Sequence, residues 1–322
     1  MAPPPHHGWQ FWIDRGGTFT DIVAQPPQGD LIVHKLLSEN PQRYRDAPLQ
    51  GIRDILGLAA TEPIPADQIT AIKMGTTVAT NALLERRGDP TLLVITAGFE
   101  DALRIGYQNR PDIFARHIQL PEMLYSRVLG VQERLSATGE VLQALTEAES
   151  EGILQALQQA RKDGLRACAI ALMHGYRYPQ HEKTIADLAR QAGFSQISVS
   201  HQVSPLIKLI SRGDTTVVDA YLSPILRRYV DRIAVEISGK AESASAFSAL
   251  PNLMFMQSNG GLTDANLFQG KDSILSGPAG GVVGAVQTSL RAGYGQVIGF
   301  DMGGTSTDVS HYGGDYERTF ET

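Results

Sequence analysis

The residues of this 322-residue chain best suited to chemistry lie in an octapeptide that occurs twice. Residues 14–21 read DRGGTFTD and residues 301–308 read DMGGTSTD, so six of the eight positions are identical. Each copy follows one apolar run and precedes another, which predicts two strands joined by a glycine turn. P-loop and Rossmann turns both open a helix, so this turn belongs to neither class.

Such a turn is suited to binding phosphate. Two glycines tolerate positive φ and close backbone approach, so successive N–H groups can converge on an anion. Threonine hydroxyls at the turn would add donors. We therefore expect two hairpins that grip the phosphates of one nucleotide. The predicted phosphate-binding residues are Arg15, Gly16, Gly17, Thr18, Thr20, Gly303, Gly304, Thr305 and Thr307.

The four aspartates of the repeat are the predicted catalytic residues. Asp14 and Asp301 end their strands at the turn, where a carboxylate can hold Mg²⁺ through its water ligands. Asp21 and Asp308 are either catalytic carboxylates or residues that cap the turn. The whole motif could also be a hairpin in which Asp and Thr only cap turns. Its duplication favours phosphate binding.

Two further segments could reach the same site. Gly75, Thr76 and Thr77 open a predicted helix, and their free N–H groups and hydroxyls could hold a substrate carboxylate or a phosphate. Asn81 lies one turn further along that helix. An ordinary threonine cap explains the pattern equally well. Residues 276–281, SGPAGG, either approach the nucleotide or simply allow close packing of a helix start.

The elements that must position these residues follow from hydrophobic patterning. Residues 9–13, 20–24 and 31–37 predict an antiparallel meander. Strands and helices then alternate, beginning with a strand at 69–74. A long helical pattern at 215–237 contains Ser223–Pro224, which predicts a kink or a new helix start. The combination indicates an α/β fold with a mixed sheet.

Composition excludes several classes of protein. A formal net charge of −6 without a basic stripe argues against a nucleic-acid partner. No apolar run reaches the roughly 20 residues that span a bilayer. The single cysteine, Cys168, rules out an intramolecular disulfide, fits a cytoplasmic location and lies in an apolar run that predicts a buried strand residue. Residues 1–8 are predicted to be a disordered tail.

Longer strings narrow the assignment. The duplicated hairpin resembles the ATPase superfamily of actin, Hsp70 and sugar kinases. Residues 11–21, 35–41, 74–86, 275–284 and 299–310 closely resemble the 5-oxoprolinase type of the hydantoinase/oxoprolinase family. The resemblance runs from Trp9 over nearly the whole chain. Arg15 and the LLSENP string at 36–41 favour this type over the shorter hydantoinase and acetone-carboxylase relatives.

The resemblance implies an actin-like (ribonuclease H-like) ATPase fold with flanking helices, incomplete in its second half. It implies hydrolysis of 5-oxo-L-proline to L-glutamate with cleavage of ATP, using Mg²⁺ and a monovalent cation such as K⁺. Phosphorylation would turn the lactam oxygen into a leaving group, a step that depends on positioning and charge neutralisation.

The same resemblance divides the chain into an N-terminal domain at residues 9–205 and a second, truncated domain at 206–322. Family members continue past this point, and the superfamily places its adenine-binding glycines downstream. The missing C-terminal region is therefore an expected partner, and a homodimer is left open. Alternative functions are an ATP-dependent hydantoinase or acetone-carboxylase-like subunit, a small-molecule kinase, or a chaperone-like or cytoskeletal ATPase.

Overall fold

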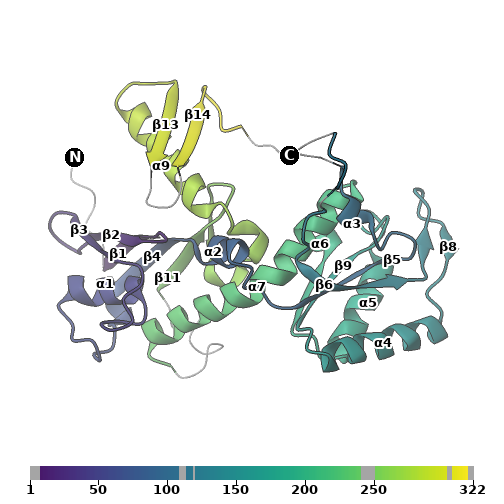
Figure 1. Ribbon diagram of the computed structural model, residues 1–322. Coiled ribbons are helices and arrows are strands. Elements are labelled where there is room, and N and C mark those ends of the chain that lie inside the picture. The colour runs from purple at the N-terminus through teal and green to yellow at the C-terminus, as the bar shows by residue number, and fades with distance from the viewer. Residues whose placement is uncertain (1–7, 109–113, 119, 241–250, 303–306, 318–322) are drawn as a thin grey trace. The chain divides into compact units, whose positions relative to one another are not determined.

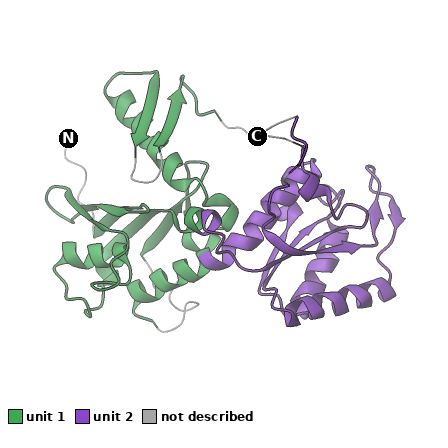
Figure 2. Ribbon diagram, viewed as in Figure 1, with its two compact units in different colours: residues 1–81, 226–322 green, residues 82–225 purple. Residues whose placement is uncertain are grey.

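The computed structural model describes residues 8–108, 114–118, 120–240, 251–302 and 307–317. The chain forms two compact units, unit 1 from residues 1–81 and 226–322 and unit 2 from residues 82–225 (Figure 2). This division differs from the contiguous one expected from the sequence, because strands from both ends of the chain pair in unit 1. Of the predicted disordered tail, residues 1–7 lie outside the described residues.

Unit 1 contains a six-stranded sheet in the order β12-β11-β4-β1-β2-β3 (Figure 1). Its strands are β1 (Trp9–Arg15), β2 (Phe19–Gln25), β3 (Ile32–Leu37), β4 (Ile69–Thr76), β11 (Asn252–Met256) and β12 (Leu262–Asp264). The first three form the expected antiparallel meander, while β4 and β11 add in parallel. The predicted mixed α/β fold is confirmed.

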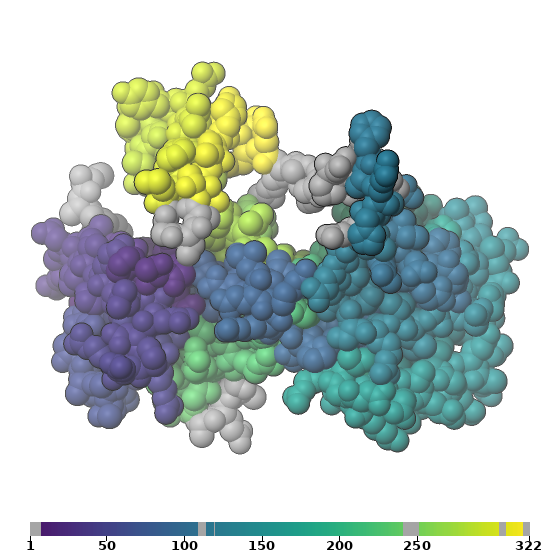
Figure 3. Space-filling view, viewed as in Figure 1, coloured from purple at the N-terminus to yellow at the C-terminus, as the bar shows by residue number. Residues whose placement is uncertain are grey.

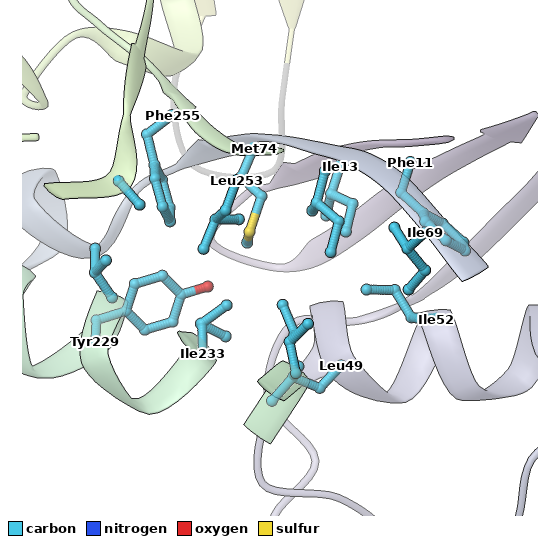
Figure 4. Packing of buried hydrophobic residues seen from close by; sticks show 14 of the residues in the cluster. Phe11, Ile13, Leu49, Ile52, Ile69, Met74, Tyr229, Ile233, Leu253 and Phe255 are labelled. Atoms are coloured by element: carbon cyan, nitrogen blue, oxygen red, sulfur yellow. The ribbon is translucent and has the colours of Figure 1, made fainter. Parts of the chain in front are cut away.

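One face of this sheet is buried by α1 (Ala47–Leu56) and α7 (Leu209–Ser238). Figure 4 shows Phe11, Ile13 and Met74 of the sheet packed towards Ile52 and Ile233 of these helices. Because side chains alternate along a strand, Trp12 and Asp14 of β1 project to the other face. Pro224 lies inside one continuous helix rather than starting a new one.

The second copy of the repeat also forms a hairpin, from β13 (Val297–Met302) and β14 (Thr307–Tyr312). Asp301 pairs with Asp308, as Asp14 pairs with Asp21 in the first hairpin. The expectation that each copy lies between two strands is therefore confirmed. The remaining elements of unit 1 are η1 (Ala66–Gln68), η2 (Ala265–Leu267), η3 (Gly270–Asp272) and α9 (Ser276–Arg291), and α2 (Val78–Leu84) begins in it.

Unit 2 has a parallel four-stranded sheet in the order β10-β9-β5-β6. Cys168 lies fully buried in β9, which confirms the predicted buried strand residue, and burial raises the pKa of its thiol to about 12. No helix in the described part of the chain is both long and apolar enough to cross a membrane. The elements are β5 (Thr91–Thr96), α3 (Ala102–Ile105), β6 (Tyr125–Val131), β7 (Arg134–Leu135), β8 (Val141–Gln143), α4 (Glu147–Lys162), β9 (Ala167–Ala171), α5 (Gln180–Gln191), β10 (Gln196–Val199) and α6 (Ser200–Val203).

Candidate functional site

The turn of the first hairpin is held from outside the repeat by Ser38. The Gly16 N–H donates to the carbonyl of Phe19 at 3.0 Å, and the Ser38 hydroxyl donates to the carbonyl of Gly16 at 2.7 Å. The same hydroxyl lies 3.0 Å from that of Thr20. Both side chains are buried. Thr20 therefore braces the turn and does not face solvent as a phosphate donor would, whereas Gly17 and Thr18 are exposed.

A cleft of about 460 Å³ opens on the sheet face that carries Asp14. It is built from β1, β2, β4, β11, β12 and the first turn of α9. The lining residues are Trp12, Ile13, Asp14, Asp21, Val23, Lys73, Met74, Gly75, Met256, Leu262, Ser276, Gly277, Gly280 and Gly281. The predicted residues Asp14, Asp21 and Gly75 thus share one concave surface with the SGPAGG segment.

Gly75 leaves space for the carboxylate of Asp14. The two residues are partners in the parallel pairing of β1 and β4. A Cβ atom at position 75 would lie 3.1 Å from Oδ1 of Asp14. A side chain there would require the Asp14 carboxylate to shift by a few tenths of an ångström.

The cleft disfavours the ionised form of Asp14. Desolvation raises the pKa of its carboxyl most, and the nearby charges of Asp21 and Asp301 raise it further, while Lys35 lowers it. The negative charge of Asp21 is balanced by an ion pair with Lys35, whose Nζ lies 2.7 Å from Oδ1 of Asp21. A cation placed among these carboxylates would relieve their repulsion.

The second hairpin approaches this cleft at Asp301, which is exposed and is not one of the lining residues. Its charge acts on Asp14, and its Oδ2 lies 3.8 Å from the Cβ position of the cleft residue Gly281. The described residues contain no group of three or more His, Cys, Asp or Glu that could hold a metal ion.

The first turn of α9 is fastened over the cleft by two side chains. Ser276 donates to the carbonyls of Thr76 and Ser273 at 3.1 and 3.0 Å, and Thr80 donates to that of Ile274. The first turn of a helix has N–H groups without intrahelical partners. In α9 the N–H of Ser276 donates to the carbonyl of Ser273 at 3.4 Å, that of Ala279 donates to the carbonyl of Leu275 at 3.0 Å, and Pro278 has none. Gly277, which lines the cleft, is therefore the first-turn residue whose N–H could meet an anion.

The Thr76 and Thr77 hydroxyls serve the local backbone. Thr76 is buried and accepts from the N–H of Val78, two residues ahead, at 3.3 Å. Thr77 donates to the carbonyl of Arg15 at 3.2 Å. Both hydroxyls are therefore engaged with backbone groups. Asn81 is half-buried in α2, and a substrate role for these residues stays a prediction.

The Arg15 side chain lies on the opposite face of the sheet from the cleft. Its guanidinium stacks over the ring of Tyr229 at 5.7 Å and acts on the charge of Asp46. Strand alternation explains this, since Arg15 shares a face with Phe11 and Ile13. With its side chain in this position, the guanidinium of Arg15 does not face a phosphate bound in the cleft. Thr307 and Asp308 are exposed in β14, and Gly303, Gly304 and Thr305 lie outside the described residues.

Two cleft residues were missed from the sequence. Lys73 holds its ammonium over the ring of Trp12, 5.4 Å from the centroid, and both line the cleft. Lys73 lies between the buried residues Ile72 and Met74 of an otherwise apolar strand. The sequence did carry a signal for Lys73. It lies two residues before Gly75 in the same strand, so both positions share one face of the sheet.

Comparison with known proteins places these features in context. A model of the hydantoinase/oxoprolinase N-terminal region matches residues 10–193, and a hydantoinase/oxoprolinase model matches residues 212–322. The 5-oxoprolinase 1 of Arabidopsis thaliana is 43% identical over 97% of this chain, which spans only 26% of that protein. The chain thus covers about a quarter of the length of the curated relatives it matches first.

Two solved structures share the fold. The ATP-dependent caprolactamase of Pseudomonas jessenii superposes with a TM-score of 0.76 at 32% identity, covering 94% of this chain and 43% of its own. A nucleotide-free acetone carboxylase superposes with a TM-score of 0.73 at 23% identity and the same coverage, which supports the fold alone. The fold and the duplicated hairpins agree with an actin-like ATPase.

Proposed function

We propose that this chain, which belongs to the hydantoinase/oxoprolinase family, is the phosphate-binding part of an enzyme that uses ATP to hydrolyse 5-oxo-L-proline to L-glutamate. The observation that carries the proposal is the shared cleft, which Asp14 of the first hairpin lines and Asp301 of the second faces. The similarity to 5-oxoprolinases over nearly the whole chain supports the substrate. ADP and phosphate would be the other products.

Each part of the cleft has a role in this proposal. Backbone N–H groups of Gly17, in the first hairpin turn, and of Gly277, in the first turn of α9, would contact the phosphates. Lys73 would neutralise charge that develops during phosphoryl transfer. Asp14 and Asp301 would hold Mg²⁺ through water. When bound, this ion supplies charge neutralisation at the transferring phosphoryl group. K⁺ dependence and a cytoplasmic location remain predictions from the sequence.

Nucleotide binding is tested by calorimetry with Mg·ATP on the chain itself and on Lys73→Met. We expect the variant to weaken ATP binding at least about tenfold, because it removes a charge that faces the phosphates. Lys162→Met, at an exposed position of α4, is the matched control and should bind as the unchanged chain does. Equal affinity for ATP in all three proteins would show that Lys73 does not contribute to phosphate binding.

The reaction is tested by product analysis on the chain completed with the downstream region of the Arabidopsis relative. Glutamate with free phosphate supports hydrolysis, whereas a stable phosphorylated product supports a kinase. The likeness to the caprolactamase favours a second candidate, hydrolysis of a larger lactam. Parallel assays with 5-oxoproline, caprolactam and hydantoin separate these substrates, and glutamate formation is the expected outcome.

A further inference from the structure

Unit 2 contains a pocket of about 600 Å³ that has no part in the proposed phosphate site. All its lining residues belong to unit 2, which runs from blue to green in Figure 3. Its walls come from α2 and α3 with the turns that follow them, from the segment at 121–124 and from the first part of α7. It shares no lining residue with the cleft that carries Asp14. Pockets of this size are typical of sites for small organic molecules.

The helix α7 lines this pocket with a face that is apolar at every position but one. Four residues at helical spacing form that face, and they are Ile210, Asp214, Val217 and Val218. Val217 is buried and belongs to the same core cluster as Leu103 of α3. The spacing predicts an apolar residue at position 214, where the chain has a carboxylate. A charge in an apolar stripe costs stability unless another group pairs with it.

The carboxyl group of Asp214 is reached by water and is still surrounded by protein. Asp214 is exposed and lines the pocket, yet desolvation raises its pKa from 3.8 to about 6. A concave wall produces this combination, because the protein displaces part of the water around the group. Among the described residues, Asp214 forms no ion pair or side-chain hydrogen bond, and no basic residue lowers its pKa. Asp214 is mostly ionised at neutral pH, so its negative charge lacks a counter-charge.

The remaining polar groups of the pocket favour a positively charged ligand. The charged lining residues are Arg86, Glu122 and Asp214, so acidic groups outnumber the basic one. Arg86 donates to the carbonyl of Glu122 at 3.2 Å. The hydroxyl of Tyr107, which also lines the pocket, lies 2.6 Å from that of Ser211 in α7. Arg86 and Tyr107 are thus held by protein groups, whereas Asp214 is open to a ligand.

We propose that this pocket of unit 2 is a second binding site, for a small molecule with an apolar body and one ammonium group. The body would contact Leu103, Val217 and Val218, and the ammonium group would pair with the carboxylate of Asp214. Such a pair would balance the acidic charge through charge-assisted hydrogen bonds in a largely apolar pocket. A neutral ligand would leave Asp214 without a counter-charge, and an anionic ligand would be repelled by it. The inference does not depend on nucleotide binding, which concerns unit 1.

The test compares three probes with the same aromatic body by calorimetry at neutral pH. They are phenethylamine, which is protonated, the neutral phenethyl alcohol and the anionic hydrocinnamate. Phenethylamine should bind at least about tenfold more tightly than the alcohol, and hydrocinnamate more weakly than either. Asp214→Asn should abolish this preference, so that amine and alcohol bind alike within about twofold. Glu151→Gln, at an exposed position of α4 outside the pocket, is the matched control and should keep the preference.

A second variant separates a binding role of Asp214 from a structural one. Asp214→Leu should raise the unfolding temperature by roughly 2–4 °C, because leucine completes the apolar face of α7. A lower unfolding temperature for this variant would show that Asp214 stabilises the fold, and would overturn the proposal.

Three binding results would also overturn it. They are no detectable binding of phenethylamine at millimolar concentration, equal binding of amine and alcohol to the unchanged chain, and tighter binding of hydrocinnamate. The last would assign the pocket to anions through Arg86. All measurements are made without nucleotide, so a failure here is distinct from a loss of ATP binding.

Discussion

Replacing Asp14 by Asn should stabilise the nucleotide-free protein while abolishing its response to Mg·ATP. The pKa of Asp14 is raised above its ordinary value of 3.8 by desolvation and by the charges of Asp21 and Asp301. Desolvation and the neighbouring carboxylates therefore disfavour its ionised form in the fold. At the proposed cation site, the same repulsion would be relieved when the ion binds.

The size of the effect follows from the strand pairing. Asp14 lies directly opposite Asp21, and like charges in such a pair destabilise a sheet by about 0.2–1 kcal/mol. Lys35 offsets part of this repulsion through its ion pair with Asp21. For a unit of this size, the neutral variant should unfold roughly 1–3 °C higher.

The pH dependence has a defined sign. A raised pKa means that the folded state holds the proton of Asp14 more tightly than the unfolded state does. The wild-type protein therefore loses stability relative to Asp14→Asn as pH rises from 3.8 through the raised pKa. Below 3.8 the two proteins should unfold at the same temperature.

The assay is thermal unfolding of the wild type, Asp14→Asn and the exposed control Asp30→Asn, each with and without Mg·ATP. At a hundredfold excess over Kd, a ligand stabilises the wild type by about 2.7 kcal/mol, so the order of the wild type and Asp14→Asn should invert when nucleotide is added. The reasoning is refuted if Asp14→Asn unfolds at a lower temperature without nucleotide, or if Mg·ATP protects it as much as the wild type.

Three further substitutions test individual contacts, two at the candidate site and one in the core of unit 2. Gly75→Ala should weaken Mg·ATP binding by calorimetry at least about tenfold, because the new methyl group would lie 3.1 Å from the Asp14 carboxylate. Ser38→Ala should lower the free energy of unfolding by about 1–3 kcal/mol in urea, since it leaves the carbonyl of Gly16 without this hydroxyl donor. Glu182→Gln should cost about 3–5 kcal/mol, because Glu182 is a buried carboxylate that pairs with His201 at 2.7 Å.

Each substitution has a control of the same chemistry. Gly284→Ala lies inside α9 with no atom within 4 Å of the added methyl group, so it should bind Mg·ATP normally. Ser195→Ala and Glu151→Gln are at exposed positions and should change stability by less than about 0.5 kcal/mol. A normal Gly75→Ala variant, or losses at Ser38 and Glu182 no larger than those of their controls, would contradict the assigned contacts.

Much of the fold could be predicted from local patterns. Period-2 alternation located the strands of both hairpins, and the duplicated octapeptide indicated their matching turns. The capping box of Thr146 and Glu149 at the start of α4 is a pattern of the same local kind. The same alternation, followed one residue further, would also have placed Arg15 with Phe11 and Ile13 on the core face. The expectation that Arg15 binds phosphate rested on its place in the motif, and it stays a prediction.

The sequence by itself determined that two copies of one hairpin exist, which residues end their strands, and that Cys168 is buried. These properties depend on neighbours a few positions apart, and chain periodicity records them directly. Only the tertiary structure decided that Ser38 braces the first turn, that Lys73 lines the cleft, and that the α9 glycines share this cleft with Asp14. These contacts depend on pairings such as that of β4 with β11, whose partners lie far apart in the chain. Local periodicity favours a strand but does not select its distant partner, and that selection builds the cleft.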